Sequence, residues 1–187
     1  MEKFSKVQNG DAKVGYYNNE KYSNKNLKII SFNDNEIVET KDTVVILPYL
    51  IEDGSILLQY NTVPNYYYKL KDSNEYRNVR DFLTVIKGPV TKDSPTKSVQ
   101  EILSNYGFVL SSMFPIEIEK CLFKSENETG QYYTCILEIG VNDYRETFSK
   151  NSEARFVKIS LGDIDDIKST DVITDYMLLR LKYKYRI

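Results

Sequence analysis

The stretch GPVTKDSPTKSVQEILSNYG, residues 88–107, decides how the rest of the chain is interpreted. An apolar run leads into Gly88, Ser94 and Pro95 can cap and start a helix, and Gly107 can end it. At about 100° per residue, Val99, Ile102, Leu103 and Tyr106 fall on one face of that helix. The sequence predicts an amphipathic helix whose outer face carries one carboxylate, Glu101, beside Gln100, Ser104 and Asn105.

Composition limits the classes of function. The chain has 187 residues, which favours one domain, and its net charge of -2 gives no field for general nucleic-acid binding or for anionic lipid. No apolar run approaches the roughly 20 residues of a membrane span, and the start of the chain lacks the apolar core of a signal peptide. We therefore expect a cytoplasmic protein with no membrane partner.

The missing residue types limit the chemistry further. With no histidine, Ser-His-Asp and Cys-His catalysis are excluded, and two cysteines, Cys121 and Cys135, are too few for a thiolate zinc site. An enzyme with this composition would depend on carboxylates, Lys, Arg, Tyr or hydroxyls, with a hard metal such as Mg2+. Sixteen Tyr without Trp, with abundant Asn and Lys, is typical of an AT-rich genome such as that of a phage or virus, whose protein would work in the host cytoplasm.

Hydrophobic patterns predict an α+β fold. Residues 1–26 are polar and without a sustained period, which indicates an extended or partly ordered arm. Predicted strands cover 26–32, 36–40, 43–51, 55–60, 81–88, 116–123, 131–139 and 154–160.

A second helix is predicted over 169–185, with Ser169 or Thr170 as its N-cap. Val172, Tyr176, Leu179 and Tyr183 repeat at steps of four, three and four, and Ile173, Met177 and Leu181 lie alongside. The pattern predicts a wide buried face made of both rows.

In the order of its elements, the chain resembles a Nudix domain of the ADP-ribose pyrophosphatase type. The resemblance covers about residues 27–185 and includes VVILPYLIEDGSILLQYNTVP, FLTVIKGPV before the helix, and IKSTDVITDYMLLRLKY at the end. It implies a Nudix-like mixed β-sheet sandwiched between helices, with an N-terminal β-hairpin extension. The domains would be an arm, 1–26, and a Nudix-like domain, 27–187, divided into a hairpin extension, 27–42, and a core, 43–187. It also implies a homodimer formed by exchanged N-terminal strands.

The Nudix box itself is degenerate. Aligned on Gly107, the chain keeps Glu101, but Gln100 stands at the position of the family's arginine and Ser104 and Asn105 replace its paired glutamates. The interval from Gly88 to Gly107 is also two residues shorter than in the motif. Because Mg2+ needs concentrated oxygen charge, the substitutions predict a weak metal site and impaired hydrolysis.

The resemblance also suggests site residues. Glu101 and Glu153 are the candidate catalytic carboxylates, and Glu101 with Asp93 is the weak candidate Mg2+ site. The candidate substrate-binding residues are Gly88, Gln100, Arg80 and Tyr67, the last in the tyrosine run 65–69. Each could instead be an ordinary surface residue, and the tyrosines suit an edge strand or a contact surface equally well.

Three functions remain open from the sequence. The first is a Nudix-fold protein impaired in hydrolysis and retained for nucleotide binding or protein assembly. The second is a divergent Mg2+-dependent hydrolase of nucleoside diphosphates linked to another moiety, such as ADP-ribose. The third is a structural or assembly component, such as a viral one.

Overall fold

The computed structural model divides the chain into two compact units. The first comprises residues 1–43 and 120–133, and the second comprises 44–119 and 134–187. The structure describes residues 3–8, 11–16, 19–23, 27–32, 35–61, 66–69, 76–79, 82–91, 94–110, 115–124, 128–145, 155–167 and 171–186. No helix among these residues is long and apolar enough to cross a membrane.

The first unit begins with two small antiparallel sheets. One is a hairpin of β1 (Lys3–Gln8) and β2 (Asp11–Tyr16). The other has three strands, β3 (Asn19–Ser23), β4 (Leu27–Phe32) and β5 (Asn35–Thr40), in that order. The predicted hairpin is confirmed, because β4 and β5 pair from Leu27 opposite Thr40 to Phe32 opposite Asn35. β3 adds a strand from within residues 1–26 to this sheet.

A seven-stranded sheet provides most of the core. Its strands run in the order β10-β7-β6-β13-β12, with β11 also pairing with β6 and β14 with β7. Their bounds are β6 (Thr43–Leu50), β7 (Ser55–Asn61), β10 (Phe82–Thr84), β11 (Ile86–Pro89), β12 (Glu119–Phe123), β13 (Gln131–Ile139) and β14 (Arg155–Ser160). The pairs that β7 makes with β6, β10 and β14 are antiparallel. The predicted strands of the core are present, but the strand predicted over 81–88 is divided into β10 and β11, and the one predicted over 116–123 begins at Glu119.

Burial explains why β6 and β7 lie near the centre of the sheet. Every residue of β6 from Val44 to Leu50 is buried, as expected for a continuous apolar run covered on both faces. β7 contributes Ile56, Leu57 and Leu58 to the same core. The turn between them contains Gly54 at a φ of +62°, a left-handed conformation that glycine adopts without steric cost.

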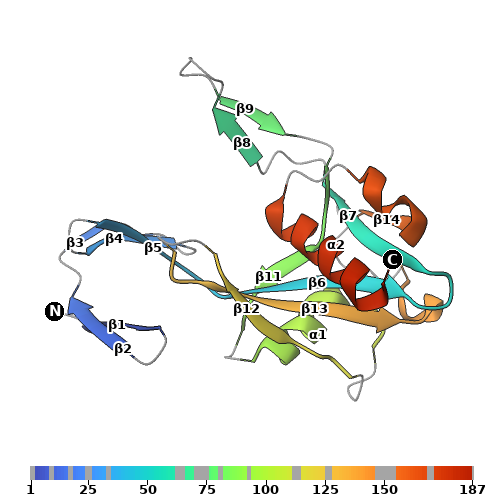
Figure 1. The fold of residues 1–187 in the computed structure, drawn as a ribbon, viewed down its shortest axis with the longest axis horizontal. Helices are drawn as coiled ribbons and strands as arrows, with labels where there is room; N and C mark the ends of the chain where they lie inside the picture. Colours follow the sequence, from blue (N-terminus) through green and yellow to red (C-terminus); the bar gives the residue numbers. More distant parts are fainter. Residues whose placement is uncertain are drawn as a thin grey trace. The chain divides into compact units, whose positions relative to one another are not determined.

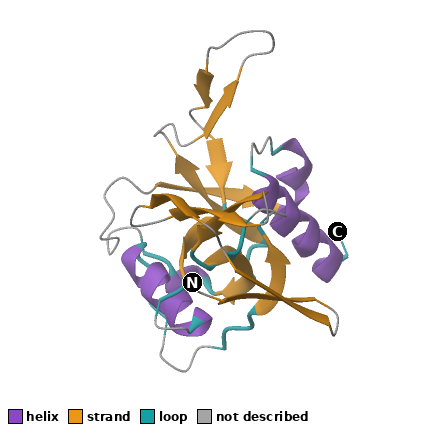
Figure 2. Cartoon of the chain, turned by 90° about the vertical axis from the view of Figure 1, so that its left-hand side faces the viewer, coloured by secondary structure: helices purple, strands orange, loops and turns teal. Residues whose placement is uncertain are grey.

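Two helices lie on opposite sides of the sheet (Figures 1 and 2). α1 (Pro95–Asn105) is the predicted central helix, and α2 (Val172–Tyr185) is the predicted terminal one. Val99 and Leu103 of α1 are buried, while Ile102 and Tyr106 are half-buried. The α+β class is thus confirmed.

The buried face of α2 differs from the prediction. Ile173, Met177 and Leu181 are buried as expected, but Val172, Leu179 and Tyr183 are 84%, 64% and 90% exposed. The sheet-facing side also includes Thr174 and Leu178. It is therefore centred on a different side of the helix from the row Val172, Tyr176, Leu179 and Tyr183. The N-cap is Asp171 rather than Ser169 or Thr170, which lie outside the described residues.

The tyrosine run belongs to a hairpin. β8 (Tyr66–Lys69) pairs antiparallel with β9 (Tyr76–Val79), with Tyr67 opposite Asn78. The prediction of an edge strand for this run is therefore compatible with its backbone.

Candidate functional site

The start of α1 is joined to the preceding loop by hydroxyl groups. Ser94 is the N-cap, and its Oγ accepts a hydrogen bond from the Lys97 amide at 3.4 Å. Ser98 is buried, and its Oγ accepts from the Thr91 amide at 2.7 Å and donates to the Ser94 carbonyl at 2.9 Å. The first bond satisfies the Lys97 amide, one of the helix-start groups without an intrahelical partner, and the others join the Thr91 loop to the helix. Ser94 was predicted from the sequence, whereas Ser98, one turn further into the helix, was not.

Glu101 is the exposed carboxylate expected on α1, and it accepts a hydrogen bond from a neighbouring hydroxyl. Thr91 Oγ1 donates to Glu101 Oε2 at 3.2 Å, so the loop after Gly88 lies within hydrogen-bond distance of the candidate residue. Ser104 Oγ donates to the Glu101 carbonyl at 2.8 Å. The Ser104 hydroxyl is therefore bonded to the helix backbone.

The C-terminal end of α1 packs against the segment that follows β13. Gly107 has a φ of +90°, and its carbonyl accepts from the Arg145 amide at 2.9 Å. Ring centroids lie 4.9 Å apart for Phe108 and Tyr144 and 5.4 Å apart for Tyr144 and Phe156. This aromatic cluster holds the segment 141–145 and the start of β14 beside α1.

β11 contacts both helices through two successive residues, which point to opposite sides of the strand. Gly88 faces α1 so closely that an added Cβ would lie 2.4 Å from Ile102 Cδ1. Its neighbour Lys87 points to the opposite side, as successive residues of a strand do, and donates to the Asp171 carboxylate at the start of α2. Gly88 is thus a packing position, and β11 is the strand between the two helices.

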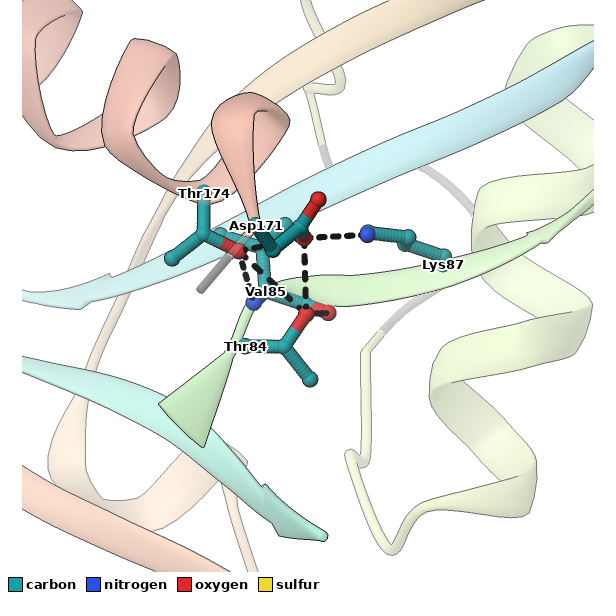
Figure 3. Close-up of polar contacts among 5 residues, drawn as sticks. All are labelled: Thr84, Val85, Lys87, Asp171 and Thr174. Atoms are coloured by element: carbon teal, nitrogen blue, oxygen red, sulfur yellow. Dashed lines mark hydrogen bonds and ion pairs between the residues drawn. The ribbon is translucent and has the colours of Figure 1, made fainter. Parts of the chain in front are cut away.

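Asp171 is the centre of a buried polar network (Figure 3). Its Oδ2 accepts from Thr174 Oγ1 at 2.8 Å and from Thr84 Oγ1 at 3.2 Å, in addition to Lys87. Thr174 Oγ1 in turn accepts from the Val85 amide at 3.1 Å. Each of these polar groups has at least one hydrogen-bond partner, and the bonds join α2 to β10 and β11. The sequence analysis did not predict this network.

Cys135 is not a candidate nucleophile. It is a free cysteine on β13 and 1% exposed. Burial raises the pKa of its thiol to about 12, so the thiolate is scarcely populated near neutral pH.

The structure describes only part of the predicted site. Glu101, Gln100 and Gly88 lie together on α1 and the end of β11, with Gln100 half-buried. For Tyr67 the structure describes the backbone alone, in β8. Glu153, Asp93 and Arg80 lie outside the described residues.

The described residues do not make a Mg2+ site by themselves. Within the ranges that the structure describes, no group of three or more acidic, cysteine or histidine side chains is placed to hold a metal ion. α1 offers one carboxylate, already bonded to Thr91, whereas Mg2+ requires several oxygen ligands in near-octahedral geometry.

Comparison with known proteins supports the fold and leaves the activity open. No protein-family model matches the sequence. No curated protein matches it either. Among solved structures, the chain is similar to one titled "Crystal structure of ADP compounds hydrolase", with a TM-score of 0.53 and 12% identity over 92% of this chain and 95% of that chain. The chain therefore has a mixed α+β fold similar to that of this structure. At this identity the match concerns the fold alone.

Proposed function

We propose that the protein is a Nudix-fold protein that binds a nucleoside diphosphate compound and hydrolyses it poorly or not at all. The likeness to the fold of an ADP compounds hydrolase supports the ligand class. The observation that carries the loss of hydrolysis is α1 itself, where Glu101 is the one carboxylate and bonds to Thr91, while Ser104 bonds to the helix backbone.

Among the described residues α1 supplies a single carboxylate, which by itself cannot concentrate the charge that holds catalytic Mg2+. Gln100 can donate a hydrogen bond to a diphosphate oxygen, but it lacks the charge and the bidentate fork of an arginine. Binding of the diphosphate would then depend on hydrogen bonds and on basic side chains, including that of the candidate residue Arg80.

The test combines binding with turnover. ADP-ribose, ADP and a nucleotide panel are titrated by calorimetry, and hydrolysis is followed with Mg2+ and with Mn2+. The variants are Glu101→Gln and, as the matched control, Glu117→Gln, which changes an exposed carboxylate outside α1. We expect binding of at least one diphosphate compound, no appreciable turnover, and the same behaviour in both variants.

Two results would contradict the proposal. Metal-dependent turnover that Glu101→Gln abolishes and Glu117→Gln preserves would show a divergent hydrolase, the second function open from the sequence. If the folded protein neither binds nor hydrolyses any of these compounds, nucleotide binding is excluded as its function, and a role in assembly is favoured.

A further inference from the structure

The outer side of α2 carries an exposed apolar row. Val172, Leu179 and Tyr183 are 84%, 64% and 90% exposed, and Tyr176 between them is half-buried. We name these four residues the α2 stripe. Val172, Leu179 and Tyr183 are exposed, whereas the buried residues of α2 are Ile173, Thr174, Met177, Leu178 and Leu181. Contiguous exposed apolar residues of this kind mark interaction surfaces more often than isolated ones do.

α2 is apolar on both sides. Its inner side is buried by the sheet through Ile173, Met177, Leu178 and Leu181. A surface helix normally has one apolar side and one polar side, whereas the outer side of α2 carries the apolar residues of the α2 stripe beside charged ones such as Asp175 and Lys184. Arg180 lies over the Tyr176 ring, 5.7 Å from its centroid, whereas Val172, Leu179 and Tyr183 stay largely exposed, so burying these three would require another molecule.

The spacing of the stripe fits a second copy of this chain. Steps of four, three and four alternate as the apolar positions of a coiled coil do, and they read the same from either end of the helix. We propose that two copies associate through antiparallel α2 helices. Val172 then lies opposite Tyr183 of the second copy, and Tyr176 lies opposite Leu179 of the second copy. Two-fold symmetry repeats both pairs, as expected for an isologous contact.

Charge favours the antiparallel arrangement. The exposed acid of α2, Asp175, is in its first turn, while Lys182, Lys184 and Arg186 are at its end. Antiparallel pairing brings Asp175 of each copy beside Lys182 of the other, and it also aligns the two helix dipoles favourably. Parallel pairing would place the basic ends together. Lys182 already donates to Asp165 in its own chain, and its ammonium group has three donors with which to serve both carboxylates.

The size of the surface predicts a weak dimer. A helix of 14 residues is about 21 Å long and, with side chains, roughly 10 Å wide. One such pair buries less than the roughly 1,200 Å² of the smaller stable interfaces. We expect association in the micromolar range or weaker, and it does not depend on the nucleotide binding proposed above.

Sedimentation velocity over a range of protein concentrations tests the association. Leu179→Glu places a charge in the middle of the stripe and should raise the dissociation constant roughly tenfold or more. Ile51→Glu is the matched control, because Ile51 is also apolar and 52% exposed but lies in a turn outside α2. A protein that stays monomeric up to its solubility limit would overturn the proposal. So would a dimer that Leu179→Glu leaves intact or that Ile51→Glu weakens equally.

Engineered cysteines test the direction of the helices. Val172→Cys and Tyr183→Cys are prepared separately and mixed under mild oxidation, with the unmodified chain as the control for its native cysteines. The antiparallel register predicts a disulfide between the two variants, and little within either variant alone. A Val172→Cys homodisulfide that forms as readily would indicate parallel helices. Failure of the mixed disulfide, with dimers present, would assign the dimer to another surface, such as the N-terminal hairpin.

Discussion

Asp171 shows how one residue can determine where an element begins. The sequence predicted the N-cap of α2 at Ser169 or Thr170. The structure shows instead that Asp171 is the N-cap and that its carboxylate accepts from Thr84, Lys87 and Thr174. Lys87 lies 84 positions earlier in the chain, so no local pattern could have predicted the pair. A clue was present locally, because Asp171 precedes Thr174 by one helical turn.

Replacing Asp171 by Asn should therefore destabilise the fold. The amide keeps the shape of the side chain but removes the charge that compensates the largely buried Lys87 ammonium group. We expect the free energy of unfolding to fall by about 1–3 kcal/mol. Urea denaturation measures the change, with Asp163→Asn as control at an exposed position. Equal losses in both variants would mean that the network contributes nothing specific.

Between elements, the contact of α1 with β11 depends on the absence of a side chain at Gly88. An added Cβ would lie 2.4 Å from Ile102 Cδ1, which is closer than real Cβ contacts come. Gly88→Ala should lower the free energy of unfolding by about 1–3 kcal/mol, because Ile102 must move within a packed interface.

Gly162→Ala is the matched control for Gly88→Ala. A Cβ at Gly162 would lie 3.7 Å from Ser160 Oγ, an ordinary contact. Chemical denaturation of both variants shows whether the close approach matters. A stability for Gly88→Ala no lower than that for Gly162→Ala would show that α1 adjusts without cost.

α2 illustrates what a periodic pattern leaves undecided. Both rows of apolar residues follow the helical period, so the sequence predicted one wide buried face. The sheet-facing side is centred instead on Met177 and includes Thr174, whose hydroxyl is bonded to Asp171 and to the Val85 amide. From the sequence alone, a threonine whose hydroxyl is buried in such a network cannot be distinguished from a polar surface residue. The strands were easier to predict, because continuous apolar runs such as Val44–Leu50 have few alternatives.

Only the backbone elements and the single carboxylate of the candidate site could be predicted from the sequence. The glycine, the capped helix and the single carboxylate were visible in the sequence, since each depends on neighbouring residues. The bond from Thr91 to Glu101 was not, because it depends on how the loop folds back over the helix. The predicted roles of Glu153, Asp93 and Arg80 remain predictions.

At the scale of the whole molecule, stability should depend on pH through the contact between α2 and β13. Lys184, and then Tyr185, donate hydrogen bonds to Glu138 and hold the pKa of its carboxyl below the ordinary value of 4.5. A carboxyl with a lowered pKa contributes stability above its unfolded value and loses it as the pH falls through the folded value. Since Glu138 is well exposed, the contribution is less than about 1 kcal/mol.

Unfolding of the native chain and of Glu138→Gln, measured from neutral pH down to about pH 3, tests this contribution. We expect the native chain to be slightly more stable at neutral pH and the difference to vanish in acid. A difference that persists unchanged in acid would assign the effect of the substitution to packing.

The pairing of β14 with β7 has a consequence for the synthesis of the protein. β7 pairs with β6 and β10, which lie close to it in the sequence. Its other edge pairs with β14, which is much later in the chain, from Arg155 opposite Tyr60 to Ser160 opposite Ser55. While the chain emerges from the ribosome, that edge stays open until residue 160 has been made, with Ile56, Leu57 and Leu58 beside it. Open apolar edges recruit other strands. We therefore expect chaperones that bind nascent chains to increase the yield of this protein, because they would cover that edge until β14 can pair with it.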